Sequence, residues 1–171
     1  MVWAQFRAGG AGEMAVEVLI VDDSEDFRFL LRKRLESYGC EVVAEARNAR
    51  EGLELFHATH PKLVTLDLMM PDAPEFKPYD LFRQIRREAP QTAVAIVSVQ
   101  RASINASTFL REGALAYWEK SFLNFDDMRR RLTRVFPDMK APTLGTARLG
   151  SSSSLSQRIR ESIAERSSHH Q

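Results

Sequence analysis

Short apolar runs alternate with amphipathic stretches through the middle of this chain. The apolar runs have the length and composition of buried strands. The stretches between them repeat apolar side chains at helical spacing, as Phe27, Leu31 and Leu35 do. The pattern predicts strands at 16–21, 41–46, 63–66, 93–97 and 116–119, each followed by a helix, and these helices start near Ser24, Asn48, Asp80, Ser103 and Asn124.

Strands separated by helices indicate an α/β fold with a parallel sheet and right-handed crossovers. Five strands suit the doubly wound, flavodoxin-like order 2-1-3-4-5. In such sheets ligands bind beyond the carboxyl ends of the strands, at the switch point between strands 1 and 3. The residues that end each strand are therefore the first candidates for a functional site.

The two ends of the chain differ in composition from its middle. Residues 1–15 contain a Gly-rich stretch and are expected to form a flexible leader, followed by a domain over 16–137. Residues 138–171 are Ser-rich and basic, which predicts a disordered tail, although 154–165 has the spacing of a short amphipathic helix. No apolar run approaches the roughly 18 residues of a membrane span, so none is expected.

Composition adds few further constraints. Of 171 residues, 44% are apolar and 27% charged, as in ordinary globular proteins. The net charge of +1 divides unevenly: residues 1–120 hold 15 basic and 18 acidic side chains, and residues 121–171 hold 9 and 5. This balance argues against general nucleic-acid binding. The single cysteine, Cys40, excludes an internal disulfide and suits a reducing, cytoplasmic location.

Polar side chains stand where four of the predicted strands end. Strand 1 ends in Asp22 and Asp23, strand 3 in Asp67, strand 4 in Ser98 and strand 5 in Lys120. Because parallel strands end at one edge, these groups are expected to converge. Clustered carboxylates repel unless a cation offsets them, and Mg²⁺ prefers such oxygen ligands. With a lysine and a hydroxyl nearby, the set suits phosphoryl transfer with an aspartate as nucleophile.

These residues carry a resemblance to a known family. The segments Val-Leu-Ile-Val-Asp-Asp-Ser at 18–24 and Leu-Asp-Leu-Met-Met-Pro at 66–71, with Ser98, Gly113-Ala114 and Lys120, resemble the receiver domain of two-component response regulators, the CheY-like fold. The resemblance covers about residues 16 to 136. It implies that Asp67 accepts a phosphoryl group from a histidine kinase or phosphotransfer protein.

The resemblance also implies a metal site. Asp23, Asp67 and the backbone carbonyl of Met69 would hold Mg²⁺ directly, and Asp22 would act through water.

A third implication concerns the response to phosphorylation. Ser98 and Lys120 would contact the phosphoryl oxygens, and Ser98 would relay the change together with Tyr117. Tyr117 matches an aromatic position that rotates in this family and reports on the face formed by the fourth helix, fifth strand and fifth helix.

The sequence departs from the family pattern at three places. The loop at 72–79 is longer than usual and lacks glycine. Ser121 replaces the proline that commonly follows the lysine in a cis peptide, so a trans bond is expected. Val99 stands where a very small residue is usual, and its bulk is expected to restrict the phosphoryl pocket.

The leading hypothesis is a single-domain receiver that signals by protein–protein interaction and is not a separate enzyme. Three alternatives stay open: a pseudo-receiver that binds partners without phosphorylation, a truncated DNA-binding regulator and an Asp-nucleophile phosphohydrolase. Met69 argues against the hydrolase, because such enzymes carry an acid two residues after the nucleophile. The downstream partner and a homodimer formed on phosphorylation are left undetermined. His57 and His60, one helical turn apart, and the arginines at 129–131 are expected to be solvated helix faces.

Overall fold

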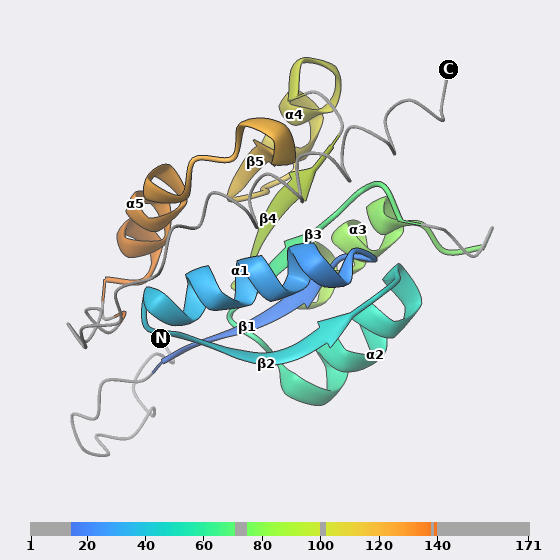
Figure 1. The fold of residues 1–171 in the computed structure, drawn as a ribbon. Helices are drawn as coiled ribbons and strands as arrows, with labels where there is room; N and C mark the ends of the chain where they lie inside the picture. Colours follow the sequence, from blue (N-terminus) through green and yellow to red (C-terminus); the bar gives the residue numbers. More distant parts are fainter. Residues whose placement is uncertain (1–14, 71–74, 100–101, 138, 140–171) are drawn as a thin grey trace, which may run out of the picture.

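The computed structural model describes residues 15–70, 75–99, 102–137 and 139, with the backbone alone for 102–105. Five strands and five α-helices alternate along these residues (Figure 1). The strands are β1 Val16–Val21, β2 Cys40–Ala46, β3 Leu63–Leu66, β4 Ala93–Ser98 and β5 Ala116–Glu119. The helices are α1 Glu25–Ser37, α2 Ala49–Thr59, α3 Pro78–Glu88, α4 Ala102–Arg111 and α5 Phe125–Val135, with a 3₁₀ turn η1 at Lys120–Phe122.

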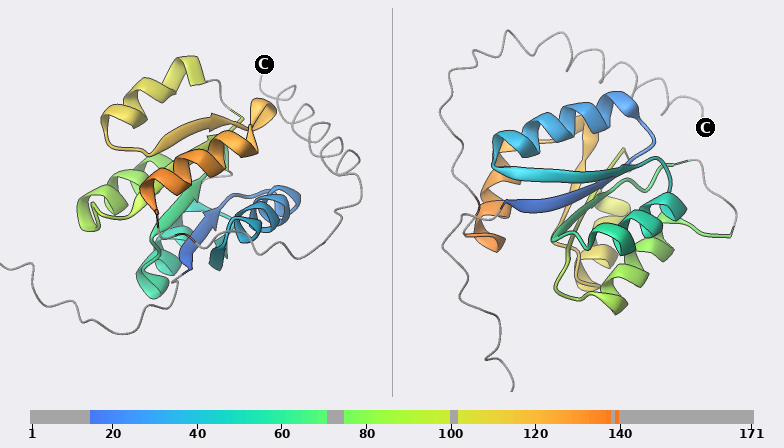
Figure 2. Two further views of the ribbon diagram at one scale, coloured as in Figure 1. Left: turned by 90° about the vertical axis from the view of Figure 1, so that its left-hand side faces the viewer. Right: turned by 90° about the horizontal axis from the view of Figure 1, so that it is seen from below.

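The strands form one parallel sheet in the order β2-β1-β3-β4-β5, which confirms the predicted topology. Helices α1 and α5 cover one face of the sheet, and α2, α3 and α4 cover the other (Figure 2). Each helical layer buries its apolar side chains against the strands, so the core consists of two clusters separated by the sheet.

The α1/α5 cluster is built around buried residues of those two helices and of the strands that face them. Its helical members include Phe27, Leu31, Leu35, Met128 and Leu132. The α2/α3/α4 cluster contains Phe56, Leu81, Phe82, Ile85 and Phe109 from its helices. Because β1, β3 and β4 lie inside the sheet, they are buried on both faces, which explains their nearly continuous apolar sequences.

The starts of α1, α2 and α5 follow the predicted capping residues. The Asn48 side chain accepts a hydrogen bond from the Glu51 amide at 2.9 Å, and the Asn124 side chain accepts from two amides at 3.0 Å. Ser24 accepts from the Phe27 amide at 3.4 Å. Gly39, just after α1, has a φ of 86°, a conformation that glycine adopts without steric cost.

Four boundaries differ from the prediction, one of them the start of α4, which begins at Ala102 rather than at Ser103. Helix α3 begins at Pro78 rather than at Asp80, because proline suits the first helical turn and Asp80 Oδ2 accepts from the Lys77 amide at 2.9 Å. Strand β2 begins one residue early, and β4 continues to Ser98. The turn η1 is an element that the apolar pattern does not indicate. The Lys120–Ser121 peptide is trans, as predicted.

Strand β2 contains an irregularity that changes the direction of its side chains. Val18 pairs with Val42, but the next residue, Leu19, pairs with Ala44, so Val43 is an extra residue in β2. Such a bulge re-aims the side chains that follow it. Downstream of it, Glu45 lies beside Ile20, a member of the α1/α5 cluster.

The predicted leader and most of the predicted tail lie outside the described residues, as does the predicted helix at 154–165. Within the described part of the chain, no helix has the length and apolar character needed to cross a bilayer.

Candidate functional site

The predicted polar residues converge at the carboxyl edge of the sheet. Asp22 and Asp67 are each 2% exposed, Ser98 and Lys120 are also buried, and Asp23 is half-buried. Their convergence follows from strand register, since Val21 pairs with Leu66 and the Asp67 amide donates to the Val21 carbonyl at 2.9 Å. Asp22 and Asp67 directly follow these paired residues, so their carboxylates lie side by side at the carboxyl edge of the sheet.

Both carboxylate oxygens of Asp67 are held by neighbouring groups. Oδ1 accepts from the Ser98 hydroxyl at 2.8 Å and from the Met69 amide at 2.9 Å. Oδ2 lies 2.6 Å from Lys120 Nζ, which is also 2.5 Å from Asp22 Oδ2. Lys120 in turn lies over the ring of Phe27, with Nζ 4.4 Å from the ring centroid. The ammonium is thus fixed between two carboxylates and an aromatic face.

The charges of this group are imbalanced. Burial raises the pKa of Asp22 from 3.8 to about 6, an effect that the Lys120 charge opposes and the Asp67 charge reinforces. Burial acts to lower the pKa of Lys120, but the charges of Asp67 and Asp22 outweigh it, and the net shift is upward. Lys120 stays protonated, and one ammonium offsets only part of the charge of three carboxylates.

The arrangement fits a hard divalent cation. Asp22, Asp23 and Asp67 each offer one carboxylate oxygen, and these three atoms lie within 4.8 Å of one another. Three converging carboxylates beside a single lysine form the kind of oxygen-rich donor set that Mg²⁺ prefers. The sequence prediction of a three-carboxylate cluster is therefore matched by the geometry.

Comparison with known proteins identifies the family. The family model described as "Response regulator receiver domain" matches residues 18–133. The chain belongs to this receiver family. Receivers generally bind Mg²⁺, and the acidic cluster of this receiver is compatible with that property. They are phosphorylatable domains that interact with kinases or phosphotransfer proteins.

Individual relatives agree with this assignment. The receiver is 30% identical to the chemotaxis protein CheY of Thermotoga maritima over 109 residues, which are 64% of this chain and 88% of CheY. It is 31% identical to the probable transcriptional regulator ycf27 of Cyanophora paradoxa over 130 residues, 76% of this chain and 52% of the regulator. The chain thus spans about half the length of that regulator.

A solved structure supports the fold. The receiver domain protein from Clostridium thermocellum superposes with a TM-score of 0.63 at 26% identity, covering 72% of this chain and 95% of that one.

The predicted switch residue, Tyr117, lies near the site, on the face of the sheet that α2, α3 and α4 cover. Tyr117 is half-buried, and its ring centroid is 6.1 Å from that of Phe109 in α4. Burial raises the pKa of its hydroxyl to about 12, so the hydroxyl is neutral. Phe109 also contacts Tyr79 and Phe82 of α3, at centroid distances of 5.5 and 5.1 Å.

We call Tyr79, Phe82, Phe109 and Tyr117 the aromatic cluster. The sequence pattern does not indicate this cluster. The spacing of Tyr79 and Phe82 by three residues indicates one helix face, but their contact with α4 is tertiary and has no local signal.

The structure describes the three departures from the family pattern to different extents. Residues 72–74 of the long loop lie outside the described residues. Val99 is half-buried. That its bulk restricts the phosphoryl pocket stays a prediction. Ser121 is exposed, and the 3₁₀ turn that contains it leaves Phe122 80% exposed next to the buried Lys120.

The other singled-out residues lie away from the site. His57 pairs through Nε2 with Glu88 Oε2 at 2.8 Å across α2 and α3, and His60 is the left-handed C-cap of α2. No metal-type group among the described residues includes either histidine.

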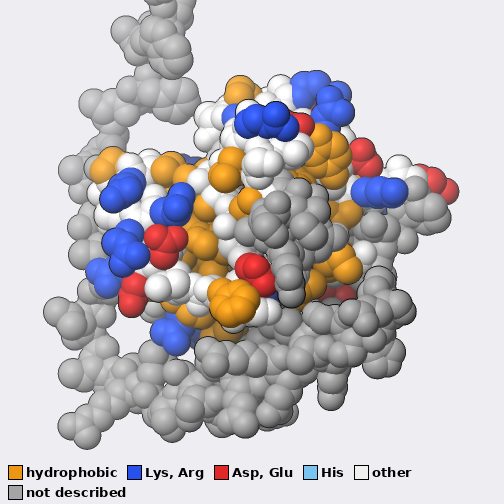
Figure 3. Space-filling model, turned by 90° about the horizontal axis from the view of Figure 1, so that it is seen from above, with side chains coloured by type: hydrophobic (Ala, Val, Ile, Leu, Met, Phe, Trp, Pro, Cys, Tyr) orange, Lys and Arg blue, Asp and Glu red, His pale blue; other side chains and the backbone are white. Residues whose placement is uncertain are grey.

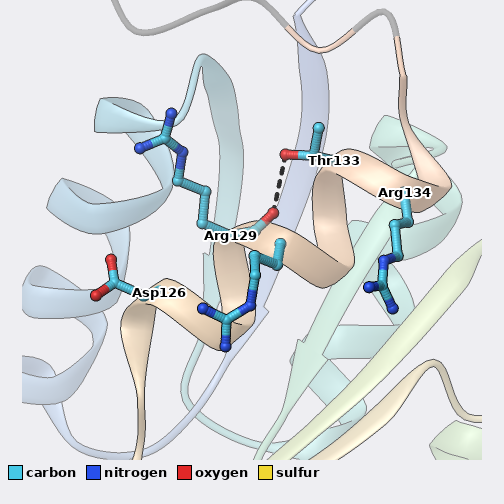
Figure 4. Close-up of a pocket in the computed structure, with 5 residues that line it drawn as sticks. Asp126, Arg129, Thr133 and Arg134 are labelled. Carbon is cyan, nitrogen blue, oxygen red and sulfur yellow. Dashed lines mark hydrogen bonds between the residues drawn. The ribbon is translucent and has the colours of Figure 1, made fainter.

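The arginines of α5 are exposed, as expected. Arg130 and Arg131 pair with Asp127, while Arg129, Arg130 and Arg134 line a shallow groove with Asp126 and Thr133 (Figure 4). Basic and acidic side chains lie side by side over this helix (Figure 3). Their mixture matches the predicted solvated face.

Proposed function

We propose that this receiver accepts a phosphoryl group on Asp67, in a Mg²⁺-dependent reaction, from a histidine kinase or phosphotransfer protein. The observation that carries the proposal is the set of contacts around Asp67. Ser98, Met69 and Lys120 together fix both of its carboxylate oxygens within 2.9 Å. A carboxylate held in this way is oriented for in-line attack on phosphorus.

Each residue has a distinct role in the reaction. An Asp67 oxygen attacks the phosphorus of a phosphohistidine while the phosphorus–nitrogen bond breaks, and the donor imidazole leaves with the electron pair. Lys120 neutralises the charge of the transferred group, and the Ser98 hydroxyl donates a hydrogen bond to one of its oxygens. Asp23, Asp67 and the Met69 carbonyl would hold Mg²⁺ directly and Asp22 would act through water, and the ion would neutralise phosphoryl charge.

The product is a changed protein surface and not a released metabolite. We therefore propose a signalling protein whose catalytic activity is limited to its own phosphorylation and dephosphorylation. Met69 stands where a phosphohydrolase would carry its general acid, and a thioether cannot donate a proton. The downstream partner would read the face formed by α4, β5 and α5, to which Tyr117 belongs.

The proposed organisation is a receiver over 16–137, with a leader at 1–15 and a tail at 138–171 that do not take part in phosphoryl transfer. The cytoplasmic location expected from the lone Cys40 stays a prediction. So do the absence of DNA binding and a homodimer formed on phosphorylation.

Phosphorylation by a small donor tests the proposal directly. The protein is incubated with Mg²⁺ and acetyl phosphate, and an acid-stable, base-labile adduct is sought by phosphate-affinity electrophoresis. Wild type should give the adduct, and Asp67→Asn should give none. Asp26→Asn, an exposed aspartate in the first turn of α1, is the matched control and should behave as wild type.

Three outcomes would contradict the proposal. A folded wild type without an adduct would favour a pseudo-receiver. An undiminished adduct on Asp67→Asn would move the acceptor elsewhere. Turnover of generic phosphate esters would favour the hydrolase.

A further inference from the structure

Arg28 of α1 is a charged residue with an unusually enclosed side chain. It is 8% exposed and follows the buried Phe27, whereas the next residue, Phe29, is 44% exposed. Its Nη1 donates to the backbone carbonyl of Asp22 at 2.7 Å, and its Nε lies 3.2 Å from Glu45 Oε2. A buried guanidinium is stable only when its charge and its donors are matched, and Glu45 and this carbonyl supply the match.

The bulge in β2 is what directs Glu45 toward Arg28. Side chains of neighbouring parallel strands point to the same face when their Cα atoms are paired. If Val43 were instead paired in register with Leu19, Glu45 would pair with Val21, which belongs to the α2/α3/α4 cluster. Because Val43 is left unpaired, Glu45 pairs with Ile20 and faces α1. The contact between Glu45 and Arg28 therefore depends on the shift of register at Val43.

The carbonyl that Arg28 contacts belongs to the peptide joining Asp22 to Asp23. This peptide is a rigid plane, so a contact at its oxygen constrains the Cα atoms on both sides. The Asp22 amide on the preceding peptide donates to the Ala46 carbonyl of β2 at 2.9 Å. The backbone that carries both carboxylates is thus held by β2 directly at one peptide and through Arg28 at the next.

We propose that Arg28, oriented by Glu45, is a positioning residue that holds the Asp22–Asp23 peptide so that its two carboxylates are aligned for the divalent cation. The inference rests on the proposed function of the site, because it concerns how that site binds Mg²⁺. Arg28 itself contacts neither the cation nor the phosphoryl group. Groups that orient metal ligands in this indirect way typically change metal affinity about 10-fold to 100-fold when removed.

A substitution series separates positioning from general packing. Arg28→Gln removes both contacts of Arg28, whereas Glu45→Gln leaves the contact with the Asp22 carbonyl in place and weakens the ion pairs of Glu45 with Arg28 and Arg32. Arg32→Gln is the matched control, because Arg32 Nε also pairs with Glu45, at 3.1 Å, while the described contacts of Arg32 include none to Asp22. Folding of each variant is checked by circular dichroism, and the Mg²⁺ dissociation constant is measured by isothermal titration calorimetry with MgCl₂.

The expected order of effects is specific. Arg28→Gln should raise the Mg²⁺ dissociation constant about 10-fold or more, Glu45→Gln should raise it less, and Arg32→Gln should stay within about twofold of wild type. The amount of adduct that Arg28→Gln forms from acetyl phosphate should be lower than that of wild type at low Mg²⁺ and equal to it at saturating Mg²⁺. A merely structural role would not give that recovery.

Wild-type affinity in a folded Arg28→Gln variant would overturn the inference, as would an equal loss in Arg32→Gln. If Arg28→Gln does not fold, Glu45→Gln and Arg28→Lys decide the question by the same titration, and unchanged affinity in both overturns the inference. A wild type that binds no Mg²⁺ and forms no adduct would instead contradict the proposed function, and the inference with it. If the wild type binds Mg²⁺ and forms the adduct, and the variants bind Mg²⁺ as tightly as the wild type, only the proposed role of Arg28 is contradicted.

Discussion

Side chains on the two faces of the sheet make different kinds of contact at its carboxyl edge. From the α1/α5 side, Arg28 donates to the Asp22 carbonyl and the Phe27 ring lies beside the Lys120 ammonium. From the α2/α3/α4 side, the approach is made by Tyr117, which packs on Phe109 of the aromatic cluster. Polar and charged contacts dominate one side, and ring packing dominates the other.

This difference gives the two sides of the site different roles. Hydrogen bonds and ion pairs are directional, so the α1/α5 side holds the aspartates and Lys120 in one arrangement. Ring contacts at 5 to 6 Å tolerate several geometries, and a half-buried ring such as that of Tyr117 has room to change its packing. The same edge can therefore be fixed for chemistry on one side and adjustable for signalling on the other.

The largest expected effect comes from truncating the most deeply buried ring of the aromatic cluster. Phe82 is fully buried, so Phe82→Ala should lower the free energy of unfolding by about 3–5 kcal/mol, measured by urea denaturation. The matched control, Phe122→Ala at an exposed ring, should change it by less than about 0.5 kcal/mol. Equal losses in the two variants would show that this face is not held by ring packing.

A second prediction concerns the charged side and depends on pH. Because the folded-state pKa of Asp22 is about 6 and its ordinary value 3.8, the folded protein binds more protons in that interval. Stability should therefore decrease as the pH rises from about 4 to about 6 and then level off, with a contribution on the order of 3 kcal/mol.

Thermal melts across this range, for wild type and Asp22→Asn, measure that contribution as their difference. Mg²⁺ should restore stability mainly above about pH 6, where Asp22 is ionised. A difference that does not change with pH would show that Asp22 is not the titrating group. Phe82→Ala should shift the whole profile without altering its slope.

The smallest predicted effect tests how well polar groups are matched inside the sheet. Thr65 of β3 is buried between Ile20 and Ala95, and its hydroxyl has no hydrogen-bond partner among the described residues. Thr65→Val should stabilise the fold by about 1 kcal/mol.

Thr92→Val is the opposite case, since the Thr92 hydroxyl donates to the Pro61 carbonyl at 3.2 Å, and it should destabilise by about the same amount. Calorimetric melting of the pair measures both changes. Two changes of the same sign would contradict the assignment of partners.

The elements and the position of the site were predictable because their signals are local. Asn48 and Asn124 cap the helices that they precede in sequence, and a parallel sheet necessarily brings Asp22, Asp67 and Lys120 to one edge. No contact between distant residues had to be known for either result.

The features that the sequence did not reveal depend on tertiary contacts. Arg28 stands on a helix between two phenylalanines, and nothing nearby distinguishes it from a solvated arginine, since Glu45 is its partner on another element. The bulge at Val43 adds a valine to a strand that already contains valine, so composition does not reveal it. The contact of Tyr79 with Phe109 likewise joins residues thirty positions apart.

The same bulge also bears on how the molecule avoids self-association. Strand β2 stands at the end of the strand order, so one side of its backbone is not paired within the described sheet. An open edge of regular spacing is a template for a strand from another molecule. The extra residue interrupts that spacing, and the exposed carboxylate of Glu41 adds like-charge repulsion between copies. Deleting Val43 would therefore remove a barrier to edge-to-edge aggregation.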